Sequence, residues 1–276
     1  MTPVVLVHLS DMHFGRDVDL AQVEACEAML PGLAPSAIVI SGDHSQRARH
    51  GEFQMSRHFR DRVERLAPTL VIPGNHDVQW WASPFGLFGS RRLYGKYRHY
   101  FGEDLAPRLE IPGAVIAGAL TSYGVAFGSL TWNPNDMAVK GHLPRSEVER
   151  VSRYFESAPP GAVRILVTHH NVLPGAISRR MGLAHWRRAQ RQISASRVDL
   201  VLCGHDHQEG SGQIDGTVTV STAGTLTLRT RGGGPSAFNV VTVDDQAVSI
   251  QHMRWDPSQL RFRASDLSRY GRIRPA

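Results

Sequence analysis

The stretch His8-Leu9-Ser10-Asp11-Met12-His13-Phe14-Gly15 follows a short apolar run at residues 4–7. The run is rich in β-branched residues and is stopped by small polar ones, which predicts a buried strand. In α/β folds, ligand chemistry collects just beyond the carboxyl ends of the strands. Asp11 and His13 stand at such an end, and side chains so placed can point at one position in space. This pair suggests a metal site, but short D-x-H matches are common by chance.

The same arrangement recurs at four later strand ends. Apolar runs predict buried strands at residues 37–40, 68–72, 163–167 and 198–202. Helical patterns are found at residues 17–30, 51–67, 144–158 and 185–195. The polar residues that follow the strands are Asp43, then Asn75, His76 and Asp77, then His169, then His205 and His207. Strands that alternate with helices predict crossover connections and a largely parallel sheet.

Further short runs complete the predicted organisation. Pro31 and Gly32 are expected to end the first helix. Residues 114–119 and 125–130 predict strands of a second sheet, joined by a turn at 122–124. Residues 217–220, 238–243 and 247–251 are expected to close that second sheet. We expect one domain over residues 1–253, and a C-terminal extension or tail over the basic residues 254–276.

Length and composition exclude several classes of protein. The 276 residues are enough for one large α/β domain. There is no apolar run of 18 residues and no signal-peptide pattern at the N-terminus, so we expect a cytoplasmic protein. Cys26 and Cys203 lack the spacing of a disulfide framework or a metal site. The net charge of +6 is modest and its arginines are spread along the chain, so no stable nucleic acid complex is expected.

Residues 78–109 interrupt the alternation of strands and helices. This inserted segment is crowded with aromatic and basic residues, among them Trp80, Trp81, Phe85 and Phe88. A long insertion beside a site is usually functional, which favours a cap that contacts substrate. The alternative is a helical hairpin whose aromatics are ordinary core. The aromatic crowding also leaves peripheral membrane contact and a dimer open.

The residues at the five strand ends have the chemistry of metal ligands. Carboxylate, imidazole and amide-oxygen donors together suit divalent Mn, Fe or Zn. With His76 left aside, seven donors are too many for one ion that keeps an open position. They suit two ions that share one carboxylate. The predicted metal ligands are Asp11, His13, Asp43, Asn75, His169, His205 and His207.

The series D-x-H, G-D, G-N-H-D, H and G-H-x-H, in this order within residues 4–224, resembles the calcineurin-like metallophosphoesterase superfamily. The resemblance implies a four-layer α/β/β/α sandwich of two mixed sheets flanked by helices. Carried over motif by motif, it assigns one metal ion to Asp11, His13 and His207. It assigns the second ion to Asn75, His169 and His205, with Asp43 as the bridge.

The resemblance also implies a reaction and two catalytic residues. The reaction is hydrolysis of a phosphoester by attack of a metal-bridging hydroxide on phosphorus. His76 would face the phosphate, where it stabilises charge or protonates the leaving oxygen. Asp77 would orient and charge the His76 imidazole. The implied substrate is a phosphodiester or a nucleotide.

The opening HLSDMHFG, the GNHD motif and the pair His169–His170 are most similar to small bacterial class III cyclic-nucleotide phosphodiesterases, which implies activity on 3′,5′-cyclic nucleotides. One alternative is a UDP-2,3-diacylglucosamine-type pyrophosphohydrolase of lipid A synthesis, in which the insertion would bind a lipid-bearing nucleotide. Another is a catalytically inactive regulatory module on the same fold, which the intact motifs disfavour. Whether His44 and His170 touch metal or substrate is left open, and His8 is expected in the core or behind the ligands.

Overall fold

The structure, a computed structural model, describes residues 2–16 and 18–272. Strands β1 (Val4–Leu9), β2 (Ala37–Ile40), β3 (Thr69–Val71), β10 (Ala237–Val243), β11 (Ala247–Asp256) and β12 (Arg261–Gly271) form one sheet. Strands β4 (Arg108–Ile111), β5 (Ala114–Gly118), β6 (Val163–His170), β7 (Leu200–Gly204), β8 (Gly210–Ile214) and β9 (Val218–Thr222) form the other. The α-helices are α1 (Leu20–Leu33), α2 (His50–Val63), α3 (Ser90–Phe101), α4 (Arg145–Glu156) and α5 (Trp186–Ser194).

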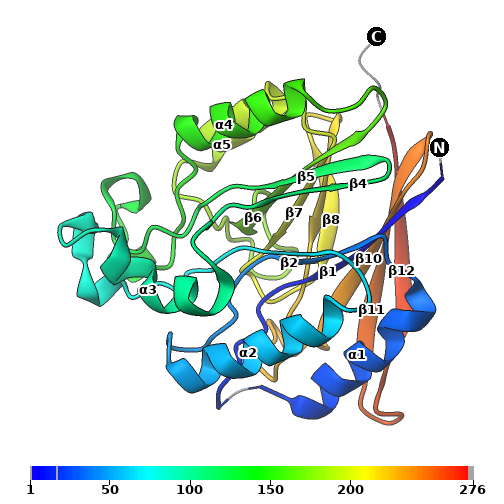
Figure 1. Cartoon of the computed structure of the whole chain (residues 1–276), viewed down its shortest axis with the longest axis horizontal. Helices are drawn as coiled ribbons and strands as arrows, with labels where there is room; N and C mark the ends of the chain where they lie inside the picture. The colour runs from blue at the N-terminus through cyan, green and yellow to red at the C-terminus, as the bar shows by residue number, and fades with distance from the viewer. Residues whose placement is uncertain (1, 17, 273–276) are drawn as a thin grey trace.

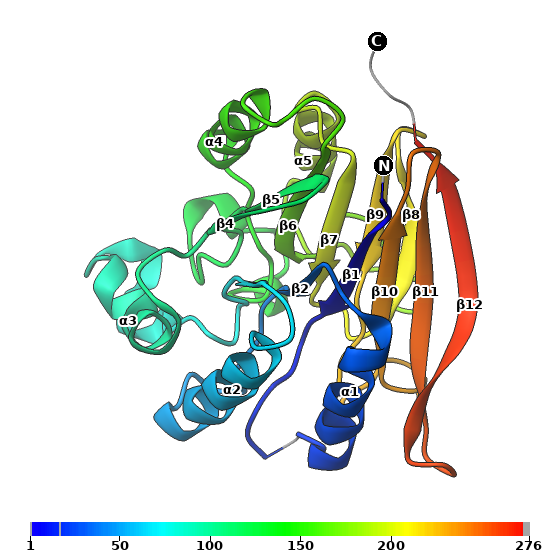
Figure 2. The same ribbon diagram turned by 45° about the vertical axis from the view of Figure 1, so that its right-hand side comes forward.

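The two sheets pack against each other, with α1 and α2 outside the first and α4 and α5 outside the second (Figures 1 and 2). Strand periodicity explains the layers, because successive side chains point to opposite faces. Leu6 of β1 lies in the core between the sheets, whereas Val7 lies in the core beneath α1 and α2. Both sheets mix parallel and antiparallel pairs. The four-layer fold is therefore confirmed.

The parallel strands place the predicted ligands together. β1, β2 and β3 run parallel in the first sheet, and β6 and β7 run parallel in the second. Their carboxyl ends meet at the side of the molecule on which α3 lies (Figure 1). The five polar motifs therefore reach one edge of the sandwich, where the two sheets meet.

Two local predictions were wrong. Helix α1 continues through Pro31 and ends at Leu33, followed by Ala34 with a φ of +44°. Proline is tolerated there because only one intrahelical hydrogen bond is lost, in the last turn. Residues 125–130 form no strand; they contain the 3₁₀ turn η3 (Phe127–Ser129). Ser129 Oγ donates to the carbonyl of Ala126 at 2.9 Å, a local bond that competes with strand pairing.

The assignment of strands to sheets also differs from the prediction. Residues 238–243 and 247–251 lie in β10 and β11, which join the first sheet beside β1 and not the second. β4 and β8 were not predicted. β12 pairs along β11, so the extension expected over residues 254–276 belongs to the sheet as far as Gly271, and residues 273–276 lie outside the described part of the chain. A bilayer-spanning helix is absent from the described residues, since none of their helices combines the required length and apolar character.

Candidate metal centre

The first group of predicted ligands converges beyond β1 and β7. Nε2 of His13 lies 2.9 Å from Nε2 of His207. Oδ1 of Asp11 lies 3.3 Å from that His207 nitrogen and 3.8 Å from Nε2 of His13. All three side chains are buried. Three donor atoms from two strand ends therefore face one small volume.

The second group lies beyond β3, at the end of β6 and beyond β7. Oδ1 of Asn75 is 3.0 Å from Nε2 of His169 and 3.0 Å from Nδ1 of His205. Asn75 is 8% exposed and His169 is fully buried. An amide oxygen and two imidazole nitrogens thus share a second small volume.

Asp43, which follows β2, lies between the two groups. Its Oδ2 is 3.5 Å from Nε2 of His13 and 3.5 Å from Nε2 of His169. Its Oδ1 accepts the backbone N–H of His76 at 2.8 Å, which fixes the orientation of the carboxylate. One oxygen is therefore placed to serve both groups, as a bridging ligand must.

The unsatisfied atoms of the first group fit a bound cation. Asp11 Oδ1 is buried and accepts no hydrogen bond from any residue in 2–16 or 18–272. The facing Nε2 atoms of His13 and His207 form at most one hydrogen bond between them. Nδ1 of His207 donates to the carbonyl of Arg229 at 2.7 Å, and Nδ1 of His169 donates to that of Ser41 at 2.9 Å. Metal-binding histidines are typically held in this way, with the other nitrogen left for the ion.

The charge states suit metal binding as well. Burial lowers the pKa of His13 to about 3 and that of His205 well below its ordinary value, so both are neutral. Burial also opposes charge on His169, but Asp43 outweighs it and raises the pKa of His169 to about 9. Despite burial, neighbouring histidines hold the pKa of Asp43 well below its ordinary range. An ion that enters the second group must therefore displace a proton from His169.

The backbone at the ligands is strained. Five of the seven predicted ligands have positive φ, among them Asp11 at 53°, Asp43 at 53° and His205 at 75°. Such conformations cost roughly 1–3 kcal/mol each and persist only where the surroundings impose them. The loops also pack closely here: a Cβ built on Gly74 would lie 2.1 Å from Oδ1 of Asp43. The glycine before Asn75 therefore allows two ligand loops to touch.

His76 stands beside the ligands without joining them. Its ring lies 4.7 Å from the His13 ring, edge to face. Its Nδ1 lies 2.8 Å from the carbonyl of Gln46, which accepts the proton of that nitrogen. This leaves Nε2 as the nitrogen available to a substrate.

The role predicted for Asp77 was wrong. Its carboxylate is buried and accepts the backbone N–H groups of His44, Ser45 and Gly74 at 3.1, 2.8 and 2.8 Å. It also accepts the Ser45 hydroxyl at 2.8 Å. No described contact joins it to the His76 ring. Asp77 instead ties the loop that carries Asp43 to the loop that carries Asn75.

His44 and His170 are both held by protein atoms. His44 binds the Ser56 hydroxyl and a backbone carbonyl, each at 3.1 Å. His170 lies close enough to His169 and His205 to be grouped with them as a ligand. Its nitrogens, however, bind the Thr121 hydroxyl at 2.9 Å and the Val139 carbonyl at 3.0 Å. Both histidines therefore lie behind the predicted ligands, where they help to hold the site in place. His8 does the same, between two serine hydroxyls.

A cleft of about 650 Å³ opens beside the second ligand group. Asn75 and His76 line it, together with Trp80, Trp81 and Lys96 of the insertion. Other parts of the insertion are core, since Tyr94 and Tyr97 of α3 are buried. The core interpretation of residues 78–109 thus applies to part of α3, and the cap that contacts substrate stays a prediction.

The sequence analysis missed two further contributors to the cleft. One is the pair Arg47 and Arg49, and the other is the segment 137–139. The arginines follow Asp43 within six residues, and that proximity was the available signal. No local signal marked residues 137–139, which reach the cleft only through the tertiary fold.

Exposed apolar side chains line this cleft and continue along the two segments that contribute to it. They come from residues 80–88, which include the 3₁₀ turns η1 (Trp80–Ala82) and η2 (Pro84–Gly86) beside α3, and from residues 127–139. We call them the apolar rim: Trp80, Trp81, Phe85, Leu87, Phe88, Phe127, Leu130, Trp132, Met137 and Val139. The rings of Phe85 and Phe127 lie 4.9 Å apart, so the two segments form one surface.

Comparison with known proteins identifies a family for this chain. A family model described as calcineurin-like phosphoesterase matches residues 4–209. A search of curated proteins finds no match.

Solved structures show the same fold at low sequence identity. The purple acid phosphatase PPD1 from yellow lupin (Lupinus luteus) is 12% identical with a TM-score of 0.66, over 98% of this chain and 54% of that one, so this chain spans about half its length. A dimetal phosphatase from Danio rerio is 10% identical with a TM-score of 0.66, over 98% and 99%. GAP50, the anchor in the inner membrane complex of Plasmodium, is 11% identical with a TM-score of 0.59, over 99% and 90%. Such identities establish the fold, and function must be argued from the site.

Proposed function

The chain belongs to the calcineurin-like phosphoesterase family, and from this premise we propose that it is a metal-dependent phosphodiesterase. The observation that carries the proposal is the position of Asp43, whose Oδ2 lies 3.5 Å from a histidine of each ligand group. Asp11, His13 and His207 would hold one ion, and Asn75, His169 and His205 the other. The mixed nitrogen and oxygen donors favour Mn, Fe or Zn.

Two ions bound there would polarise the phosphoryl oxygens and lower the pKa of a water molecule, the chemistry that a two-metal site supplies. The chain's own residues position the substrate and move the proton. With Nδ1 held by the Gln46 carbonyl, His76 presents Nε2 to the cleft. In its protonated form this nitrogen can bind a phosphate oxygen or give its proton to the leaving oxygen.

The cleft supports a nucleotide as the substrate. Trp80 and Trp81 offer aromatic faces on which a base can stack. Arg47, Arg49 and Lys96 add positive charge, and no carboxylate lines the cleft within the described part of the chain. Its volume of about 650 Å³ falls in the range of small-molecule sites. We therefore propose 3′,5′-cyclic nucleotides as the first substrate class to test.

A second candidate is a UDP-2,3-diacylglucosamine-type pyrophosphohydrolase. The specific observation in its favour is the apolar rim at the mouth of the cleft, where acyl chains could lie. The inactive regulatory module has less support, because all seven ligand side chains are present and converge.

The experiment that tests the reaction uses metal-stripped protein reloaded with Mn²⁺. We expect bis-p-nitrophenyl phosphate, a diester, to be cleaved faster than p-nitrophenyl phosphate, a monoester. Asp43→Ala is the control, because the activity of the predicted site should fall at least about 10³-fold in this variant. A monoester preference would overturn the phosphodiesterase proposal in favour of a phosphatase. Cyclic AMP and UDP-2,3-diacylglucosamine, assayed side by side, then separate the two substrate candidates.

A further inference from the structure

The apolar rim is unusually exposed for a soluble surface. The side chain of Trp132 is fully exposed, at 102%, and that of Phe127 is 80% exposed. Leu87 and Phe88 are 73% and 60% exposed. Single exposed apolar residues are ordinary, but a contiguous group of aromatic and aliphatic side chains marks an interaction surface. The rim is therefore a surface suited to an apolar partner.

The two segments of the rim are held together. The backbone N–H of Phe85 donates to the carbonyl of Val125 at 2.8 Å, directly before the second segment. Trp80 and Trp81 line the same cleft as Met137 and Val139. The rim thus includes residues of the cleft wall from both segments.

Positive charge flanks the rim on one side. Residues 78–102 contain Arg91, Arg92, Lys96 and Arg98 but no Asp or Glu. Arg91 and Arg92 are exposed and form no ion pair with any residue of the described ranges. The Arg92 guanidinium lies 5.5 Å from the centre of the Phe88 ring. Cationic and apolar groups therefore sit next to each other on this surface.

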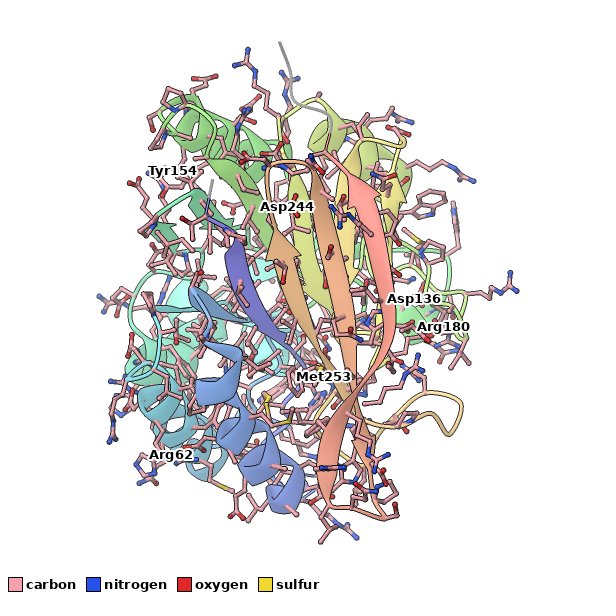
Figure 3. All side chains as sticks on the ribbon, turned by 90° about the vertical axis from the view of Figure 1, so that its right-hand side faces the viewer. Arg62, Asp136, Tyr154, Arg180, Asp244 and Met253 are labelled. Carbon is pink, nitrogen blue, oxygen red and sulfur yellow. The ribbon has the colours of Figure 1, made fainter. Side chains whose placement is uncertain are left out.

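Positive charge also lies beside the second segment of the rim. The backbone at Gly141 pairs with Leu183, which places the loop with Arg179 and Arg180 beside the second segment. Both arginines are exposed. Figure 3 shows Arg180 and Asp136 on the same side of the molecule. Asp136, the acidic residue of that segment, accepts the Thr131 hydroxyl at 2.8 Å.

We propose that the apolar rim docks on a lipid surface that carries anionic headgroups. The aromatic side chains would enter the boundary between headgroups and acyl chains, which amphipathic rings favour. The flanking arginines would lie at the level of the anionic headgroups. A second copy of this chain fits less well, because rim-to-rim contact would bring the arginines of both copies together.

Docking has one consequence for the reaction. It turns the mouth of the cleft toward the headgroup layer, so an amphiphilic phosphoester could enter without leaving the lipid. This consequence rests on the proposed function. Docking itself requires neither metal nor catalysis and can be tested separately.

The test is co-sedimentation with vesicles, in the absence and presence of Mn²⁺. We expect binding to vesicles of phosphatidylcholine and phosphatidylglycerol at 3:1, and weaker binding to pure phosphatidylcholine. The double variant Phe127→Ser/Trp132→Ser removes two exposed side chains that do not line the cleft. It should weaken binding at least about tenfold, since burial of one such side chain is worth about 1.5–3 kcal/mol. Leu260→Ser, which changes a 66% exposed leucine between β11 and β12, is the matched control and should bind like the wild type.

The arginines have a test of their own. Arg91→Gln and Arg92→Gln should each weaken binding to the anionic vesicles about fivefold and reduce its dependence on salt, on the scale of about 1 kcal/mol per basic residue. Neither change should alter the weaker binding to phosphatidylcholine.

Three results would overturn the proposal. The wild type could fail to sediment with anionic vesicles, or the double variant could bind as well as the wild type. Sedimentation equilibrium could instead reveal a dimer that the double variant loses, which would assign the rim to a second copy. Thermal unfolding confirms that each variant is folded. Turnover of bis-p-nitrophenyl phosphate separates the two proposals, because a failure of docking leaves that activity intact and a failure of the enzyme proposal leaves docking intact.

Discussion

The loops that carry the metal ligands and the segments that form the apolar rim lie at the same edge of the sandwich but differ in construction. Asp11, Asp43 and His169 are buried, and the first two have positive φ; despite burial, neighbouring charges lower the pKa of both aspartates and raise that of His169. Phe127 and Trp132 are exposed; Phe127 lies in the 3₁₀ turn η3 and Trp132 in the irregular connection that follows it. The ligand loops directly follow strands of both sheets, so the packing of the sheets shapes them. The rim segments lie outside the strands of either sheet. Small changes in the ligand loops should therefore alter the rate of hydrolysis. Changes in the rim should instead alter which substrate or which surface the protein binds.

The largest effect is expected from Asp43→Ala. The change removes the oxygen that faces both ligand groups, so the protein should no longer bind two ions. Loss of the two-metal chemistry is worth several kcal/mol, so activity should fall at least about 10³-fold. Metal content by mass spectrometry and diesterase turnover measure the two effects. Asp266→Ala changes an exposed carboxylate and should preserve both; two ions bound with normal turnover in Asp43→Ala would refute the bridging role.

His76→Ala should separate catalysis from metal binding. The ring contacts the ligands without belonging to them, so both ions should remain. Loss of a general acid lowers the rate by roughly 10²–10⁴-fold. The effect should appear in kcat and depend on the leaving group, with good leaving groups affected least. Loss of metal together with activity would show that His76 is a ligand instead.

Gly74→Ala tests whether packing of the ligand loops shapes the site. The added Cβ would lie 2.1 Å from Asp43 Oδ1, so the loops must move apart. Overpacking of this kind costs about 1–3 kcal/mol of stability, and metal affinity should fall with it. Gly51→Ala is the matched control: its Cβ meets nothing within 4 Å on α2, and it should stabilise the protein by up to about 1 kcal/mol. Urea unfolding and metal titration compare the pair; equal stability would contradict the packing argument.

Trp81→Ala should have the smallest effect and confine it to substrate binding. Stacking of a base is worth about 1–3 kcal/mol, so KM for a nucleotide substrate should rise about tenfold or more with kcat nearly unchanged. Steady-state kinetics on cyclic AMP measure it. Trp132→Ala, a tryptophan of the rim outside the cleft, should leave this soluble reaction unaltered. A kcat effect from Trp81→Ala would place the cleft wall in the chemistry itself.

Prediction from sequence succeeded where local pattern and spacing carry the information. The strand at residues 37–40 was predicted with its observed bounds, and all seven predicted ligands follow apolar runs that do form strands. It failed where partners are distant in sequence. Alternating residues identify β10 and β11 as strands, but their pairing with β1 depends on which edge is free after the chain has folded. Asp77 was misjudged for the same reason, because its partners His44 and Ser45 lie more than thirty residues away.

The sequence by itself determined the donor set, its order along the chain and the family, since these depend on residue types at strand ends. The family resemblance already implied how the donors divide around Asp43, but only the tertiary structure supplied the distances of 3.5 Å from Asp43 to a histidine of each group, because distances across two sheets are not encoded in local pattern. It also decided that Asp77 joins two loops and that residues 127–139 meet residues 80–88 at the cleft. The physical reason is that a side chain's role depends on the atoms it contacts, and long-range packing of the sheets and their connecting loops selects those atoms.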